Sequence, residues 1–331
     1  MAMVHAEDPC RGRKPSIPEM LTDPDLLSPY LEDASGSTPG NAAGLFRPES
    51  EEEISAWMRA TLPERVAVLP QAARSSLTGG ARPCGEVVVS VERMAGVRLH
   101  GDGTATVGPG MRLVDLQQEL EEHRRYYPPV PTHQEAMLGG TVSTNAGGPA
   151  TFKYGVTRQW IRSLRVVLYN GDVLDIHRGQ ALAASGESFR IVLSDGAVRT
   201  VPVPTYRLPD LKKISAGYHA SDPLDLLDLF VGSEGTLGMI TRVTLDTVPL
   251  PPAVFAGLAF AADDLQAVEL AGELRRAALS GRSGEANQPD VRAIEWVDSR
   301  CLDLLKEHGD LRNLKLQLPP DAGSAVLFEM E

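Results

Sequence analysis

The sequence is poor in cysteine. Its 331 residues include only 3 cysteines, Cys10, Cys84 and Cys301, which stand far apart and form no C-x-x-C pair. This spacing excludes a disulfide framework and a zinc or iron–sulfur cluster built from cysteines of this chain. Because an odd, sparse count suits a reducing compartment, we expect a cytoplasmic protein.

Long hydrophobic runs and positive charge are also lacking. No stretch approaches the roughly 18 consecutive apolar residues of a membrane span, and residues 1–18 lack the apolar core of a signal peptide. Lys and Arg number 32 against 44 Asp and Glu, a formal charge of −12. This balance disfavours nucleic acid and anionic membranes as partners, so any phosphate must be held locally.

A length of 331 residues allows about two domains, and the hydrophobic pattern predicts both helices and strands. Asn170-Gly171 and Asp195-Gly196 each favour a β-hairpin, and the proline cluster at 249–252 is typical of a domain boundary. The acidic run at 49–53 is expected to face solvent at a helix N-terminus. Helices are predicted at 25–34, after Ser50, and at 113–123, 265–279 and 300–308; strands are predicted at 66–69, 87–91, 97–99, 104–107, 164–168, 173–176, 190–193, 198–201, 240–245, 255–260, 291–297 and 325–330.

Neither G-x-x-x-x-G-K-[ST] nor G-x-G-x-x-G occurs, so a P-loop or Rossmann site is not supported. The sequence has three loops of small residues instead. The first, residues 69–80, would expose consecutive backbone N–H groups, and such a nest holds a diphosphate without net positive charge. An ordinary wide turn is the alternative for this loop taken alone.

The second and third loops, residues 131–148 and 230–240, are less ordinary. In the second loop, Gly139-Gly140 and Gly147-Gly148 bracket a run of Thr, Ser and Asn. Glycines let the main chain approach a flat ligand, while hydroxyls and amides supply directional hydrogen bonds. The glycines at 232, 235 and 238 are spaced one helical turn apart, so we expect a smooth face that could pack under a ring system.

Two long motifs carry a family resemblance. They are Gly139-Gly140-Thr141 through Gly147-Gly148 with the run 153–158, and the run 229–238. Residues 69–249 resemble the flavin-binding half of the vanillyl-alcohol oxidase/PCMH superfamily, in its branch of FAD-linked D-2-hydroxyacid dehydrogenases. The resemblance implies an FAD-binding PCMH-type domain of two α+β subdomains at 41–250, after an extension at 1–40. Residues 251–331 would begin an α+β, ferredoxin-like cap that stops mid-sheet, so we expect a truncated chain.

The resemblance also implies cofactor residues. The first loop would hold the pyrophosphate, the second would line the isoalloxazine and ribityl region, and Glu234, Gly235 and Ile240 would lie near the adenine or behind the ring. The implied FAD-binding residues are Gln71, Ala72, Ala73, Arg74, Ser75, Ser76, Leu77, Thr78, Gly79, Pro131, Thr132, Gly139, Gly140, Ser143, Asn145, Gly148, Tyr154, Gly155, Glu234, Gly235 and Ile240. Because no histidine lies in the first loop and Cys84 follows its glycines, we expect non-covalent FAD.

The first loop departs from the family pattern. Relatives read R-G-x-G-T where this chain has Gln71 to Ser75, with no glycine before Gly79. Ala72 and Arg74 resist a positive φ, so the sequence argues against left-handed geometry at these positions. We expect Arg74 to point outward and add a charge-assisted contact to the pyrophosphate, the alternative being a solvated arginine.

Catalytic residues are harder to predict. His133 is the best local candidate for a general base, with a structural role as its alternative. Lys153, Tyr154 and Arg158 could bind a substrate carboxylate, or Arg158 could anchor loop carbonyls while Tyr154 packs. Glu234 is expected to be a buried carboxylate or a cap. The family's H-x-G-D-G-N-x-H motif is absent, because residues 307–311 share only part of it, and no metal site is predicted.

The resemblance implies an oxidoreductase that oxidises a small D-2-hydroxy acid by hydride transfer to flavin N5. Its electrons would pass to a quinone, another flavoprotein or oxygen. One alternative is an NADPH-dependent reductase of the same fold acting on a nucleotide-sugar enolpyruvyl ether. Another is a degenerate, non-catalytic FAD-binding subunit of a larger complex. An open sheet edge at 325–330 would favour an oligomer.

Overall fold

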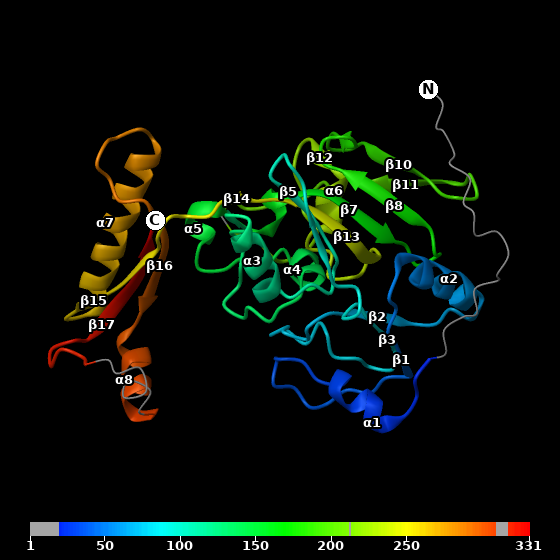
Figure 1. The fold of residues 1–331 in the computed structure, drawn as a ribbon, viewed down its shortest axis with the longest axis horizontal. Coiled ribbons are helices and arrows are strands. Elements are labelled where there is room, and N and C mark those ends of the chain that lie inside the picture. Colours follow the sequence, from blue (N-terminus) through cyan, green and yellow to red (C-terminus); the bar gives the residue numbers. More distant parts are fainter. Residues whose placement is uncertain (1–19, 212, 309–316) are drawn as a thin grey trace.

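The computed structural model describes residues 20–211, 213–308 and 317–331, and it has an α+β fold. Figure 1 shows a main body with a smaller C-terminal unit beside it. Cys10 lies outside the described residues, as does part of the run at 307–311. No helix in the described part of the chain has the length and apolarity that a bilayer crossing needs.

The main body is built around a five-stranded antiparallel sheet in the order β4-β5-β13-β7-β8. The central strand β13 pairs with β5 on one side and β7 on the other. Leu164 and Val243 on these strands are fully buried in the largest apolar core. The strands are β4 (Val97–Leu99), β5 (Thr104–Val107), β7 (Ile161–Val167), β8 (Val173–His177) and β13 (Met239–Asp246).

A three-stranded parallel sheet lies next to it, in the order β1-β3-β2. Its strands are β1 (Gly44–Phe46), β2 (Val68–Gln71) and β3 (Val87–Ser90), and helix α2 (Glu51–Thr61) packs against them. Ile54 and Trp57 of α2 pack against Val89 in its core. The N-terminal helices α1 (Pro24–Leu27) and η1 (Ser28–Tyr30) add Leu27 and Tyr30 to a third core cluster.

Helices and short strands close the body around the large sheet. Leu113, Leu116 and Leu120 of α3 are fully buried, as the apolar stripe predicted. These elements are α3 (Leu113–Glu122), α4 (Leu138–Ser143), α5 (Thr151–Tyr154), α6 (Leu226–Phe230), η2 (Leu62–Glu64), η3 (Thr157–Trp160), β6 (Arg125–Tyr126), β9 (Leu182–Ala183), β10 (Ser188–Val192), β11 (Val198–Pro202), β12 (Leu224–Asp225) and β14 (Val248–Pro249).

The C-terminal unit is a three-stranded antiparallel sheet, β15-β17-β16, with two helices. Its elements are β15 (Phe255–Ala261), α7 (Asp264–Arg282), β16 (Val291–Val297), α8 (Ser299–His308) and β17 (Ser324–Met330). Each of them was predicted from the sequence within a few residues. The expected open sheet edge at 325–330 is wrong, because β17 is the central strand of this sheet and pairs on both sides. In Figure 1 this unit stands beside α5 of the main body.

The hairpins predicted at Asn170-Gly171 and Asp195-Gly196 are confirmed, by β7–β8 and β10–β11. The prediction that the acidic run at 49–53 faces solvent is wrong for Glu51, which is buried. Its carboxylate accepts hydrogen bonds from Arg165 Nη2 at 2.5 Å and from Thr241 Oγ1 at 2.5 Å. The charge of Glu51 therefore ties α2 to the large sheet instead of capping a free helix end.

Candidate functional site

The three small-residue loops meet in space, although they are far apart in the sequence. The second and third loops are joined by hydrogen bonds from Glu234 N to Ser143 O at 2.8 Å and from Gly232 N to Val142 O at 3.0 Å. The first loop touches both. A Cβ built on Gly140 would lie 3.2 Å from Ala72 Cβ, and one built on Gly235 would lie 3.1 Å from Pro70 Cγ. The loops therefore form one site.

The first loop leaves its backbone donors free. Within the described residues, no hydrogen bond is formed by the N–H groups of residues 73–77. The loop closes on itself only afterwards, where Ser76 Oγ accepts from Gly80 N at 3.1 Å. A Cβ built on Gly79 would meet nothing within 4 Å, so this end of the loop is open. Unpaired consecutive donors of this kind are suited to an anion such as a diphosphate.

Each loop also contains one non-glycine residue in the left-handed region: Arg74 with φ 57°, Asn145 with φ 48° and Glu234 with φ 51°. The expectation that Arg74 avoids a positive φ is therefore wrong, because the surrounding contacts impose it. Non-glycine residues in this region carry local strain, which concentrates at functional sites.

Two expectations for these loops need correction. The glycines at 232, 235 and 238 do not form a helical face, because all have positive φ and lie in turns before β13. Arg74 does not point outward into solvent; its Cζ lies 4.9 Å from the centre of the Tyr30 ring. Its Nη1 atom is buried, and in the described part of the chain it has no hydrogen-bond partner.

The second loop is closely packed at its glycines. A Cβ on Gly148 would fall 1.8 Å from Val130 O, and one on Gly139 would fall 2.7 Å from Pro109 Cβ. Asn145 is 2% exposed, and its side chain is engaged by Ile214 O at 3.0 Å and by Arg158 N at 2.9 Å. This amide therefore fixes the loop from within.

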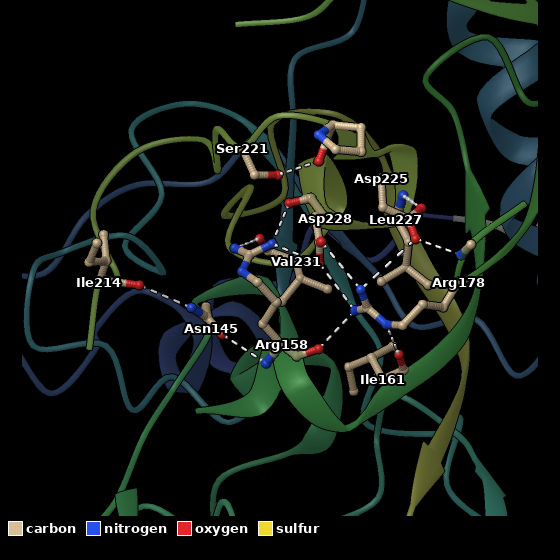
Figure 2. Close-up of polar contacts among 12 residues, drawn as sticks. Asn145, Arg158, Ile161, Arg178, Ile214, Ser221, Asp225, Leu227, Asp228 and Val231 are labelled. Atoms are coloured by element: carbon tan, nitrogen blue, oxygen red, sulfur yellow. Dashed lines mark hydrogen bonds and ion pairs between the residues drawn. The ribbon is translucent and has the colours of Figure 1, made fainter. Parts of the chain in front are cut away.

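Below the second and third loops, Arg158 is held by an internal network (Figure 2). Its guanidinium donates to the carbonyl oxygens of Asp228 and Val231, each at 2.5 Å, and to the Asp228 carboxylate at 3.2 Å. Arg178 donates to the same carboxylate at 3.1 Å and to Arg158 O at 2.8 Å. Burial lowers the pKa of Arg158, and the charge of Asp228 opposes that shift. These contacts match the alternative in which Arg158 anchors loop carbonyls.

Lys153 and Tyr154 on α5 also have protein partners. Lys153 Nζ lies 2.5 Å from the Asp290 carboxylate and 2.6 Å from that of Glu331, and Tyr154 OH donates to Glu331 at 2.5 Å. Burial and the Glu331 hydrogen bond raise the pKa of Tyr154 to about 12. Arg292 completes the cluster at 3.1 Å from Glu331. A pocket of about 480 Å³ lies beside α5.

The remaining predicted residues lie in different settings. His133 is exposed, as is Thr132, while Pro131 is half-buried. Glu234 is also exposed, so the expectation of a buried carboxylate is wrong; one of its oxygens would lie 3.8 Å from a Cβ built on Gly80. Ile240 is buried in the apolar core of the large sheet. The structure therefore brings the loop residues together but leaves His133 without a carboxylate partner among the described residues.

Sequence reasoning missed three residues that support the site: Tyr30, Arg178 and Asp228. Tyr30 came from a segment interpreted as an extension, and nothing in its local pattern links it to residue 74. Asp228 directly precedes the motif at 229–238, so its position was a usable signal. Within the described ranges, no group of three or more His, Cys, Asp or Glu side chains is placed to hold a metal ion.

Comparison with known proteins shows the family of the chain. The profile of the family described as an FAD binding domain matches residues 42–177, which include the first two loops. The chain belongs to the FAD-binding PCMH-type oxidase family. Its α+β fold agrees with that of solved FAD-linked oxidases, so the predicted family and fold class are confirmed.

Several curated proteins are similar to this chain. D-lactate dehydrogenase of Anaerostipes hadrus is 32% identical over 64% of this chain and 39% of its own length. Mitochondrial D-2-hydroxyglutarate dehydrogenase of Danio rerio is 31% identical over 90% of this chain and 48% of its own. Glycolate oxidase subunit GlcD of Bacillus subtilis is 28% identical over 91% and 54%. The chain thus spans about half the length of these relatives, or less.

Among solved structures, chitooligosaccharide oxidase aligns with a TM-score of 0.61 and 17% identity, over 92% of this chain and 51% of its own. Alkyldihydroxyacetonephosphate synthase aligns with the same TM-score of 0.61 and 18% identity, over 89% and 48%. At these identities the likeness shows the fold alone. The curated relatives to which this chain is similar belong to the D-2-hydroxyacid dehydrogenase group.

Proposed function

We propose that this chain binds FAD non-covalently where the three loops meet, and that it is the flavin-binding part of an enzyme oxidising a small D-2-hydroxy acid. One observation carries the proposal: the N–H groups of residues 73–77 are unpaired within the described residues and stand at the junction of the loops. A diphosphate would supply the acceptors that these donors lack.

The residues present fit this cofactor. The first loop, from Gln71 to Gly79, would hold the pyrophosphate. Gly139, Gly140, Ser143, Asn145 and Gly148, with Pro131 and Thr132, would line the flavin side. Backbone donors suit a chain whose formal charge is −12, because they bind phosphate without requiring lysine or arginine. When bound, FAD supplies the electron chemistry, while the chain binds it, orients it and excludes water.

The substrate class is proposed from the relatives. Their names give D-lactate, D-2-hydroxyglutarate and glycolate as the compounds on which they act. We expect one small 2-hydroxy acid to bleach the bound flavin in anaerobic titrations. The test adds each of these compounds to the purified holoprotein in turn. A flavin spectrum unchanged by all of them would contradict the dehydrogenase assignment while leaving FAD binding intact.

A second candidate is a chain that binds FAD without catalysing a reaction. It is favoured by the engagement of Lys153 and Arg158, two cations that follow the second loop in the sequence, with internal acceptors. An unchanged spectrum in the same titrations supports this candidate. Reduction by one hydroxy acid excludes it.

The non-covalent attachment is tested separately. Acid precipitation of the holoprotein is expected to leave all FAD in the supernatant, since no histidine lies in the first loop. Flavin retained in the washed pellet would contradict this part of the proposal.

A further inference from the structure

The segment from Asp23 to Ala43 contacts the first loop near its start, in its middle and just after its end. At the start of the loop, Gln71 Nε2 donates to Tyr30 O at 2.9 Å. In the middle, Ala34 N donates to Arg74 O at 3.0 Å. At the end, Ala81 N donates to Asp33 Oδ2 at 3.2 Å. A loop with free N–H groups has few bonds of its own, so these external bonds define its path.

Tyr30 makes the central contact. The guanidinium of Arg74 lies 4.9 Å from the Tyr30 ring centre, and the ring is 6% exposed. Its hydroxyl donates to Glu92 Oε1 at 2.5 Å, which fixes the ring from the opposite end. A cation over an aromatic face is attracted more strongly where water is excluded. This attraction offsets the cost of holding Arg74 at φ 57°.

We propose that Tyr30 is a positioning residue for the cofactor. Through Arg74 its ring holds the first loop in the conformation that presents the N–H groups of residues 73–77 to the diphosphate of FAD. The inference rests on the proposed function, since it assumes that this loop binds the diphosphate. It assigns the segment 23–43 to the cofactor site as a brace, although the sequence places most of that segment in an extension.

The test measures the dissociation constants of FAD and of riboflavin, which has no diphosphate, by flavin fluorescence on the full apoprotein. Tyr30→Leu is expected to weaken FAD binding about tenfold and to leave riboflavin binding unchanged. Tyr30→Phe keeps the ring and loses the hydroxyl with its hydrogen bonds to Glu92 and from Arg47, so we expect FAD binding to weaken only about threefold. The matched control is Leu26→Ala, at a residue of the same segment that is 49% exposed and apart from these contacts.

A double variant tests the route through Arg74. Arg74→Met alone should weaken FAD binding about as much as Tyr30→Leu, and the two together should cost no more than either, because they remove the same contact. Additive losses would overturn the proposal. An unchanged FAD affinity in Tyr30→Leu would also overturn it. So would a Tyr30→Leu variant whose affinities for FAD and for riboflavin fall by the same factor.

The same data separate this inference from the proposed function. A wild-type chain that does not bind FAD contradicts the proposed function itself. If the wild-type chain binds FAD and the Tyr30→Leu variant binds it equally well, only the positioning role of Tyr30 is contradicted. If Tyr30→Leu does not fold, amide hydrogen exchange on the wild type decides: FAD must slow exchange in residues 28–36 as well as 72–80. Protection confined to 72–80 overturns the proposal.

Discussion

Arg158 and Arg178 share the Asp228 carboxylate beneath the second and third loops. Because the side chains of Arg158 and Asp228 are only 12% and 11% exposed, each charge depends on the other for its solvation. Arg158 also satisfies two backbone carbonyls. Removing this side chain therefore leaves several buried acceptors unpaired, which is costly whether or not a substrate ever meets it.

We predict that Arg158→Met lowers the free energy of unfolding by about 3 kcal/mol, measured by urea denaturation. The control is Arg162→Met, whose side chain is 57% exposed and paired with Asp246. Exposed ion pairs contribute little to stability, so we expect the free energy of unfolding of this variant to change by less than about 1 kcal/mol. Equal losses in the two variants would contradict the structural role of Arg158.

Glu51 gives a prediction for pH. Burial raises the pKa of this carboxyl, but hydrogen bonds from Arg165 and Thr241 outweigh burial and leave the pKa below its usual 4.5. A lowered folded pKa means that the ionised carboxylate contributes stability above pH 4.5 and loses it as the pH falls through the folded value.

Glu51→Gln should therefore be less stable than the wild type by about 2 kcal/mol at pH 7. The difference should shrink steadily as urea denaturation is repeated at pH values below 4.5. If the difference in stability between Glu51→Gln and the wild type stays constant until acid unfolds the chain, the charge of Glu51 does not contribute to stability.

At the scale of elements, glycine in the second loop is required by close approach of the backbone. A Cβ on Gly148 would overlap Val130 O at 1.8 Å, and neither group is at the end of a flexible side chain. Gly148→Ala is expected to weaken FAD binding more than tenfold and to destabilise the chain by about 2 kcal/mol. Flavin fluorescence and thermal unfolding measure the two effects.

The control for this variant is Gly101→Ala. Gly101 has ordinary φ and nothing within 4 Å of its built Cβ, so the change should leave both quantities unaltered. A Gly148→Ala chain that matches Gly101→Ala in FAD affinity and melting temperature would contradict the packing described for the second loop.

The elements also show how far sequence alone reaches. Strands and helices with a clear period were predicted closely: β16 lies at Val291–Val297, as expected, and α7 extends the expected helix by a few residues. The short helices α4 and α5 were missed, because six- and four-residue helices made of small residues carry no apolar period. The left-handed φ of Arg74 was also missed, since it depends on Tyr30, a tertiary neighbour.

At the scale of the whole molecule, the C-terminal unit is docked by charge. Lys153 of the body lies against Asp290 and Glu331 of the unit, and Arg292 of the unit donates to Tyr126 OH at 2.9 Å. The sequence identified Lys153 and Tyr154 but not their partners, which lie 137 or more residues away. The prediction that they bind a substrate carboxylate stays a prediction. Their contacts with Asp290 and Glu331 also hold the C-terminal unit against the main body.

Loss of this contact should loosen the unit. Lys153→Met is expected to speed cleavage of the connection at residues 250–254 several-fold in limited proteolysis, while the melting temperature of the body changes little. Lys306→Met is the control, because the one ion pair that Lys306 forms with the described residues is with Asp303, in the same helix α8. Equal cleavage rates in the two variants would contradict docking through Lys153.

The central claim is that backbone N–H groups of the first loop bind the diphosphate of FAD. The most direct measurement titrates the apoprotein with FAD and with riboflavin under identical conditions and follows flavin fluorescence. The account predicts one FAD bound per chain, with riboflavin held far more weakly because it offers the N–H groups of residues 73–77 no acceptor. A chain that binds neither compound, or that binds both equally well, would contradict it.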